Sequence, residues 1–310
     1  MANKKIYEIL KEVLIEITPS KEEIKSIKNH LDEFLDEINR RIKKSRIDVE
    51  IFIGGSYAKN TLIKKEKYDV DIFIRFDKKY PDEELSSLTQ KLLKGIKNVS
   101  VIHGSRDYFK IKVANNTELE IVPVRRIKHP KEAKNITDLS YSHVRYVFKK
   151  MKNLSDEIRL AKAFCHANNC YGAESYVNGF SGYSLELLVY HYRSFLKFIK
   201  AMKKQQDKII IDIEKDYKNK QEILMNLNSS KIQSPIILID PTYKHRNATA
   251  ALSEEVFNRF TKACKDFLKN PSKKMFQAEK INLEKIKDNA KIKKYEFILL
   301  ELKTSKPEGA

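Results

Sequence analysis

Asp69 and Asp71 stand two residues apart in the segment YDVDIFIRF (Tyr68–Phe76). Residues two apart on a β-strand point to the same face, so these carboxylates project together while Val70 and Ile72 pack behind them. Two adjacent carboxylates repel each other unless a cation lies between them, and Mg²⁺ prefers such oxygen ligands. The pair therefore predicts a site for two Mg²⁺ ions that bridge a nucleoside triphosphate and an attacking hydroxyl group.

A Gly-Gly-Ser turn precedes this strand, in the segment IFIGGSYAKNT that covers residues 51–61. Gly55 lets the backbone approach phosphates, the helix start after it offers free N–H groups, and Ser56 adds a hydroxyl donor. The alternative is a hairpin-like turn with surface aspartates. Twelve residues separate Ser56 from Asp69, with a predicted strand on each side. This combination favours metal-dependent nucleotidyl transfer over the alternative.

Glu120, in the segment ELEIVPV, is expected to add a third carboxylate from a neighbouring strand. At that place it contacts the metal nearer the primer and helps to deprotonate the 3′-hydroxyl group.

The elements that must position these residues are predicted by hydrophobic periodicity. Ser20 and Glu23 form a capping box for a long helix that runs to about Lys44. The first half continues with one helix over residues 81–96. Its strands are predicted over residues 47–53, 68–76, 99–103, 108–113 and 118–124. The second half is mainly helical, with helices over residues 139–151, 155–168, 181–202 and 252–268, strands within 203–213 and 235–240, and a final strand in YEFILLELK (295–303).

Composition sets broad limits on the class of protein. The chain has 310 residues and a formal net charge of +19, which suits an anionic partner such as nucleic acid but also reflects a lysine-rich composition. The apolar runs are too short for a membrane span, and the N-terminus lacks a signal-peptide core. Three cysteines fit a reducing compartment, so we expect a cytoplasmic protein.

One cluster raises the possibility of zinc. Cys165, His166 and Cys170 lie close together, but no second pair of ligands accompanies them. An ordinary pair of small helical residues is the preferred interpretation.

Further motifs appear in a characteristic order, and they resemble those of class I, archaeal-type CCA-adding tRNA nucleotidyltransferases. That family lies within the DNA polymerase β-like nucleotidyltransferase superfamily, whose pattern the Gly-Ser turn and Asp-x-Asp resemble. The resemblance covers nearly the whole chain and rests on these segments: LEIVPV, IRLAKAF, YGAE, GFSGYSLELL and DPTYKHRNATAALS.

The resemblance implies roles for particular residues. Asp69, Asp71 and Glu120 correspond to the metal ligands. The positions that contact the nucleotide, mainly its triphosphate or base, are His143, Lys162, Tyr171 and Arg246. Without the resemblance, each of these four has an ordinary structural interpretation, such as a solvated lysine or a helix end at Tyr171.

The resemblance also implies an α/β (α+β) fold and a domain organisation. We expect a catalytic head with a mixed sheet (1–138), a helical nucleotide-binding neck (139–250) and a truncated body-like segment (251–310). The implied reaction adds nucleotides from CTP or ATP to the 3′ end of tRNA or a tRNA-like RNA.

Three departures from the family pattern bear on these expectations. Glu120 stands where the family has aspartate, Lys59-Asn60 replaces Arg-Gly, and the family continues beyond YEFILLELK through a tail that grips tRNA. Two other functions are therefore weighed: a primer-independent synthase of oligoadenylate or cyclic-nucleotide second messengers, and a non-catalytic RNA-binding scaffold.

Overall fold

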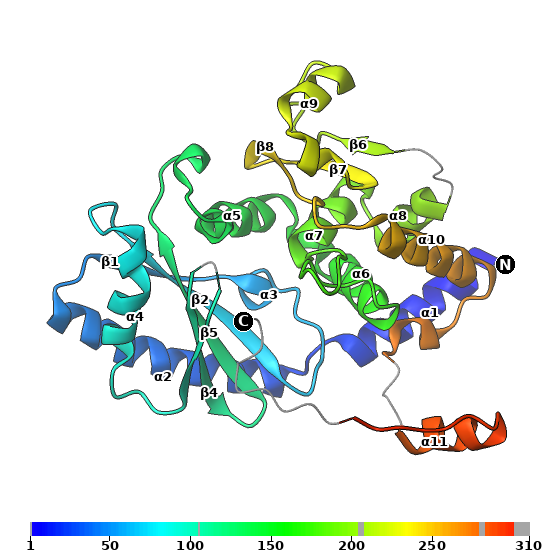
Figure 1. Ribbon diagram of the computed structural model, residues 1–310, viewed down its shortest axis with the longest axis horizontal. Helices are drawn as coiled ribbons and strands as arrows, with labels where there is room; N and C mark the ends of the chain where they lie inside the picture. The colour runs from blue at the N-terminus through cyan, green and yellow to red at the C-terminus, as the bar shows by residue number, and fades with distance from the viewer. Residues whose placement is uncertain (1, 105, 204–207, 279–282, 301–310) are drawn as a thin grey trace.

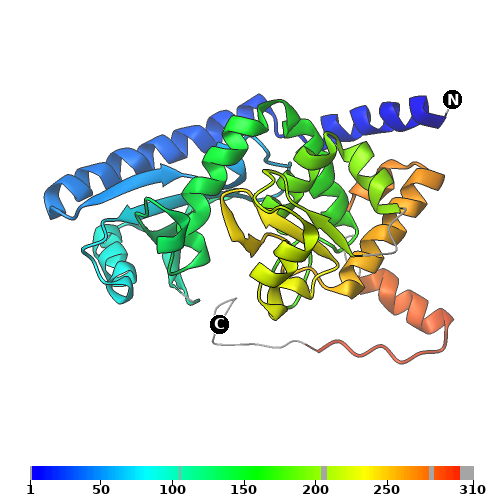
Figure 2. The same ribbon diagram turned by 90° about the horizontal axis from the view of Figure 1, so that it is seen from above.

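Two lobes lie side by side in the computed structural model (Figures 1 and 2). The structure describes residues 2–104, 106–203, 208–278 and 283–300. The first lobe contains a five-stranded sheet in the order β1-β2-β5-β4-β3. The β2–β5 pair is parallel and the other pairs are antiparallel, which confirms the predicted mixed sheet. Its elements are α2 (Lys21–Ser45), β1 (Val49–Ile53), α3 (Gly55–Ala58), β2 (Tyr68–Phe76), α4 (Leu85–Leu93), β3 (Val99–Ile102), β4 (Tyr108–Ala114) and β5 (Thr117–Arg125).

Helices α2 and α4 cover one face of this sheet. The predicted capping box is present, because the Ser20 side chain accepts from the Glu23 backbone and Glu23 accepts from the Ser20 backbone. Apolar side chains of α2, such as Ile38, share one core with Ile72 and Ile121 of the sheet. Because side chains alternate along a strand, the residues between these apolar ones point to the opposite face. That opposite face carries the predicted metal ligands.

A second core joins the helices of the other lobe. Helix α1, at the N-terminus, contributes Ile6, Leu10 and Val13 to this core rather than to the sheet lobe. Helix α10 contributes Phe260 and Phe267. The elements of this lobe are α1 (Ala2–Ile17), α5 (Ser140–Lys150), α6 (Ser155–Ala167), α7 (Gly182–Tyr192), α8 (Phe195–Lys203), β6 (Ile209–Ile211), α9 (Lys220–Asn226), β7 (Ile236–Asp240), β8 (Tyr243–Asn247) and α10 (Glu254–Lys269).

Two of the predicted elements differ from the structure. The single helix expected over 181–202 is two helices, because Arg193 adopts a left-handed conformation (φ 67°) that ends α7. The final strand expected in YEFILLELK is wrong over 295–300, where the backbone has no regular structure; its remaining residues lie outside the described part. Periodicity also missed α1, α9, β8 and a helix near the end, α11 (Leu283–Ile292).

Phe164 is the central aromatic side chain of the second core, and its removal provides a test of that core. Its ring contacts those of Phe195, Phe260, Phe267 and Phe276, with centroids 5.4–6.0 Å apart. We expect Phe164→Ala to lower the free energy of unfolding by about 3–5 kcal/mol, because buried apolar surface is lost and a cavity remains. Urea unfolding measures this loss.

Phe148→Ala is the matched control, because that ring is 56% exposed. Equal losses in the two variants would contradict the assignment of Phe164 to the centre of the core.

Candidate active site

One cavity of about 390 Å³ gathers most of the predicted site residues. It opens at the boundary between the two lobes, with strands β2 and β5 on one side and helices α6 and α7 on the other. Seven of the nine predicted residues line it: Gly55, Ser56, Asp69, Asp71, Glu120, Lys162 and Tyr171. Arg246 and His143 lie elsewhere, in a neighbouring part of the second lobe.

The glycine pair allows the turn after β1 to sit directly on β2. The Gly54 N–H donates to the Asp71 carbonyl oxygen at 2.9 Å. A Cβ atom on Gly54 would collide with the Phe73 ring, and one on Gly55 would collide with Oδ2 of Asp71. Gly55 also has φ +61°, a conformation that favours glycine. The turn therefore needs glycine both for its conformation and for its closeness to the carboxylate.

The three carboxylates occupy adjacent places on the open face of the sheet. Asp71 of β2 lies opposite Glu120 of the parallel strand β5. Asp69 lies two residues before Asp71 and projects from the same face of β2. Burial raises the pKa of Asp71 to about 6, and the negative charges of Glu120 and Asp69 add to this shift. The negative charge is thus only partly balanced by the protein. Oxygen donors with this charge suit a hard divalent cation.

Glu120 is held by a lysine on its other side. Its Oε1 lies 3.1 Å from Nζ of Lys110 on β4. In the part of the chain that the structure describes, no three acidic, histidine or cysteine side chains form a ready metal cluster. The longer side chain of glutamate, compared with aspartate, extends the carboxylate of Glu120 to Lys110. The predicted role of Glu120 as a third ligand stays a prediction.

A buried glutamate orders two lysines across the cavity. Glu186 of α7 is fully buried and accepts from Lys59 Nζ at 2.8 Å and from Lys162 Nζ at 3.1 Å. Lys162 also donates to Thr61 Oγ1 at 2.8 Å. Burial lowers the pKa of Lys162. Burial tends to raise the pKa of Glu186, but the charges of Lys59 and Lys162 lower it below its usual value.

The loop after the glycine turn is bound by the second lobe. Arg159 of α6 donates to the carbonyl oxygens of Asn60 at 2.9 Å and Leu62 at 3.0 Å. Together with the Lys59–Glu186 and Lys162–Thr61 contacts, these bonds fix the loop against helices α6 and α7. The cavity is therefore shared between the lobes, and its cationic side depends on both.

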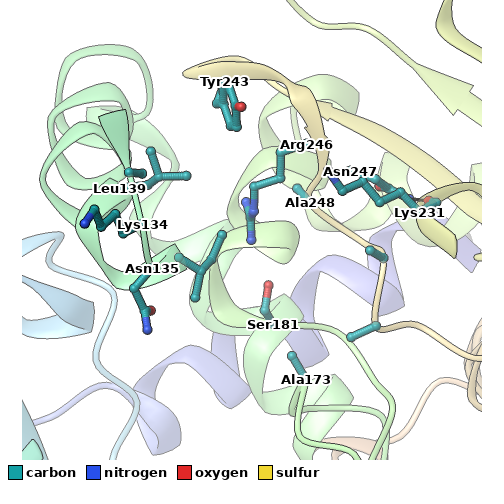
Figure 3. Close-up of a pocket in the computed structure, with 14 residues that line it drawn as sticks. Lys134, Asn135, Leu139, Ala173, Ser181, Lys231, Tyr243, Arg246, Asn247 and Ala248 are labelled. Atoms are coloured by element: carbon teal, nitrogen blue, oxygen red, sulfur yellow. Dashed lines mark hydrogen bonds between the residues drawn. The ribbon is translucent and has the colours of Figure 1, made fainter. Parts of the chain in front are cut away.

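Arg246 lines a second cavity of about 400 Å³, which adjoins the first along the segments near Ala173 and Ser181. Figure 3 shows the Arg246 side chain extending from β8 into the middle of this cavity. The charged end of Arg246 is oriented by Asp240, whose Oδ2 accepts from it at 2.8 Å. Asn135 and Leu139, from the segment before α5, line the other side.

His143 is part of the same network rather than a lining residue of either cavity. Its Nε2 lies 2.9 Å from Oδ2 of Asp240, and its ring stacks on Tyr183 with centroids 4.0 Å apart. Burial lowers the pKa of His143 more than the bond to Asp240 raises it. Asp240 is fully buried, and its ionised carboxylate can only accept, so His143 donates to it from Nε2. Asp240 therefore links His143 and Arg246.

Sequence reasoning missed several residues that shape the site. Lys59 was noted only as a departure from the family pattern, and Thr61 was not considered. Glu186 carried a signal, since it is the one acidic residue in the apolar helix segment GYSLELLVY. A buried charge requires a partner, so that pattern indicates an ion pair. Asp240 carried a similar signal, since it follows an apolar run and begins the segment DPTYKHRNATAALS.

The segment that holds Cys165, His166 and Cys170 lies at the end of α6 and just after it. Cys165 and Cys170 are both buried free cysteines, and the described residues contain no metal-binding group of three such side chains. His166 instead stacks on Tyr171, with ring centroids 3.9 Å apart.

Comparison with solved structures identifies the fold. A cytoplasmic RNA terminal U-transferase superposes with a TM-score of 0.67 at 15% identity, covering 90% of this chain and 100% of that one. CdnC of E. coli MS115-1, solved with ATP, gives a TM-score of 0.62 at 14% identity, covering 87% and 94%. The fold is that of the polymerase β-like nucleotidyltransferases. Members of this superfamily generally use divalent metal ions, and the Cid1 poly(U) polymerase has been solved with MgATP.

Sequence comparison finds similarity to two family models and to archaeal CCA-adding enzymes. Residues 156–277 match the model for the second domain of tRNA nucleotidyltransferase. Residues 5–144 match the Second Messenger Oligonucleotide or Dinucleotide Synthetase domain. The CCA-adding enzyme of Nanoarchaeum equitans is 40% identical over 77% of this chain and 59% of its own length. That of Methanocaldococcus jannaschii is 34% identical over 92% and 64%.

These comparisons support a class I, archaeal-type CCA-adding tRNA nucleotidyltransferase, since archaeal CCA-adding enzymes are 34–40% identical to this chain over most of its length. The chain spans about three fifths of the length of the curated relatives it matches. No helix in the described residues has the length and apolar character needed to cross a membrane.

Gly55→Ala tests whether the turn must approach the carboxylate. We expect it to abolish metal-dependent nucleotide binding, because the added methyl group displaces Asp71. It also costs about 1–2 kcal/mol of stability through its positive φ. Thermal unfolding and titration with a Mg²⁺-nucleotide complex measure the two effects separately.

Gly95→Ala is the matched control, because Gly95 has φ +85° but no atom near its would-be Cβ. It should lose similar stability and keep nucleotide binding. Equal binding losses in both variants would show that backbone strain alone is responsible.

The raised pKa of Asp71 predicts how stability depends on pH. The folded-state pKa of about 6 exceeds the ordinary value of 3.8, so the folded protein binds more protons between these limits. The Asp71 contribution therefore makes the free energy of unfolding fall as pH rises from about 4 to 6, by at most about 3 kcal/mol. Asp71→Asn should remove this fall. Urea unfolding of the metal-free protein at several pH values measures it.

Asp266→Asn, at an exposed position of α10, controls for the general effect of losing a carboxylate. If wild-type protein and Asp71→Asn show the same pH dependence, the raised pKa is wrong.

Proposed function

We propose that this protein transfers nucleotides from CTP or ATP to the 3′ end of tRNA or a tRNA-like RNA, without a template. The observation that supports this most strongly is the shared cavity, where carboxylates of the sheet face lysines ordered by Glu186. Such a cavity suits a metal-bound triphosphate, whose cation needs oxygen ligands and whose phosphates need cationic donors. The similarity to CCA-adding enzymes supports the choice of RNA substrate.

Asp69 and Asp71 are proposed to hold two Mg²⁺ ions, with Glu120 as the third carboxylate. When bound, the ions supply Lewis-acid stabilisation of the phosphate undergoing attack. Glu120 takes part once its carboxylate turns from Lys110 toward the aspartates, where it accepts the proton of the attacking 3′-hydroxyl group. Pyrophosphate leaves as the new phosphodiester bond forms.

The cationic side of the cavity is proposed to bind the triphosphate. Lys59 and Lys162 point into it, and Glu186 keeps both lysines in place before the nucleotide arrives. Ser56 adds a hydroxyl donor from the glycine turn. Preordered donors of this kind stabilise developing charge without reorganisation during the reaction.

The neighbouring cavity is proposed to receive the base. Arg246 extends into it and is oriented by Asp240, so its guanidinium group has a fixed direction for hydrogen bonding. Tyr171 lines the first cavity, where its ring would lie beside the nucleotide. His143 supports this arrangement indirectly, through Asp240. Because the proposed substrate is tRNA, we also propose a cytoplasmic location.

A second candidate function is the primer-independent synthesis of second-messenger nucleotides. It is favoured by one observation, the match of residues 5–144 to the Second Messenger Oligonucleotide or Dinucleotide Synthetase domain. The match of residues 156–277 to a tRNA nucleotidyltransferase domain favours the primary proposal.

The experiment incubates the purified protein and Mg²⁺ with each labelled triphosphate, with and without tRNA transcripts that end before each nucleotide of the CCA end. We expect labelled CTP or ATP to be incorporated only when a transcript is present. Asp69→Asn should lower the rate by at least about 10³-fold, because one metal ligand loses its charge.

The matched control is Asp266→Asn, which should keep the wild-type rate. Products formed from triphosphates alone would support the second-messenger function instead. RNA binding without any turnover would support the scaffold.

A further inference from the structure

Two rows of side chains cross the open face of the sheet, from the carboxylates to a pair of lysines. The register places Asp71 opposite Glu120 and Glu120 opposite Lys110. The next row places Asp69 opposite Glu118, and Glu118 opposite Lys112. Neighbouring strands lie about 4.8 Å apart, so the lysines of β4 stand roughly 10 Å from the aspartates of β2. Cationic side chains therefore begin one strand beyond the metal side of the active site.

The two lysines line a hollow of about 330 Å³ beside the catalytic cavity. Three of the side chains that line this hollow are lysines, Lys67, Lys110 and Lys112, and one is acidic, Glu118. Its other polar lining residues are Asn98, Ser100 and Tyr108. The Lys110–Glu120 ion pair forms the border between the hollow and the catalytic cavity, at 3.1 Å.

The lysines of β4 are held on this face by the packing of the strand. Phe109 and Ile111, which alternate with them, lie in the core under α2 and α4. Lys112 is exposed, and Lys67 is only loosely paired with Glu118, at 4.0 Å. The hollow thus presents ammonium groups on a rigid strand. Ammonium, hydroxyl and amide donors on one surface match the phosphates and sugars of a nucleic-acid backbone.

The position of the hollow indicates which nucleic acid it receives. In the proposed function, the triphosphate lies on the side of the carboxylates that faces Lys59 and Lys162. The attacking hydroxyl group must then approach the carboxylates from the other side, which is the side of β5 and β4. We propose that the open face of β4, with Lys110, Lys112 and the neighbouring Lys67, binds the sugar-phosphate backbone of the RNA strand whose 3′-hydroxyl group attacks. This inference rests on the proposed function.

Lys112→Ala and the double variant Lys67→Ala/Lys112→Ala test this surface, because both leave the Lys110–Glu120 pair intact. The binding of a tRNA acceptor-stem transcript is measured over a range of salt concentrations. Each removed lysine should reduce the slope of log K against log salt by about 0.7–0.9, with a matching loss of affinity. The affinity for CTP with Mg²⁺ should not change. Lys112→Arg should retain the wild-type slope, since it keeps the charge.

Lys91→Ala is the matched control, because Lys91 is exposed on α4, the helix that covers the opposite face of the sheet. In one outcome, the wild-type protein extends RNA and the Lys112→Ala variant binds RNA with the wild-type salt slope and affinity. This outcome would overturn the proposed surface and leave the proposed function standing. Equal weakening of CTP and RNA binding would also overturn it. Wild-type protein that neither binds nor extends RNA would overturn both proposals.

Discussion

Repulsion between carboxylates on one face of a sheet is the constraint on which the site depends. Asp69, Asp71 and Glu120 occupy neighbouring positions of β2 and β5, and burial strengthens their mutual effect. The structure balances this charge on two sides, with Lys110 on β4 and with Lys59 across the cavity. A bound cation would balance the remaining negative charge of the carboxylates. The open face thus combines a charge that attracts metal ions with lysines that suit phosphates.

Glu186 connects the charged groups of the site to the contact between the two lobes. It is a buried carboxylate of the second lobe, yet one of its partners is Lys59, on the loop after the glycine turn. Arg159 binds the same loop through carbonyl oxygens. Separation of the lobes at this point would break the Lys59–Glu186 ion pair, while Glu186 would keep its bond to Lys162 of its own lobe. The cavity of the candidate site is therefore formed by both lobes together.

In the neighbouring cavity, too, a buried carboxylate orients a cationic side chain. Asp240 accepts hydrogen bonds from His143, Tyr183 and Arg246, which come from three different elements. Only Arg246 extends into the cavity itself. Its direction depends on a carboxylate that is fully buried and does not line the cavity, so one flexible side chain presents a defined set of donors.

The sequence by itself predicted the strands of the first lobe and the projection of Asp69 and Asp71 from one face of β2, because a two-residue spacing on a strand is a local property. It also determined the glycine turn, which the structure explains by the contact of Gly55 with Asp71. Tertiary structure alone decided the pairing of Lys59 and Lys162 with Glu186, the turning of Glu120 toward Lys110, and the place of His143 behind Asp240. These contacts join residues distant in the chain, and their energies depend on burial, which no local pattern specifies. For the same reason, the segment YEFILLELK has the alternation of a strand but forms none over 295–300: a strand requires a partner with which to pair.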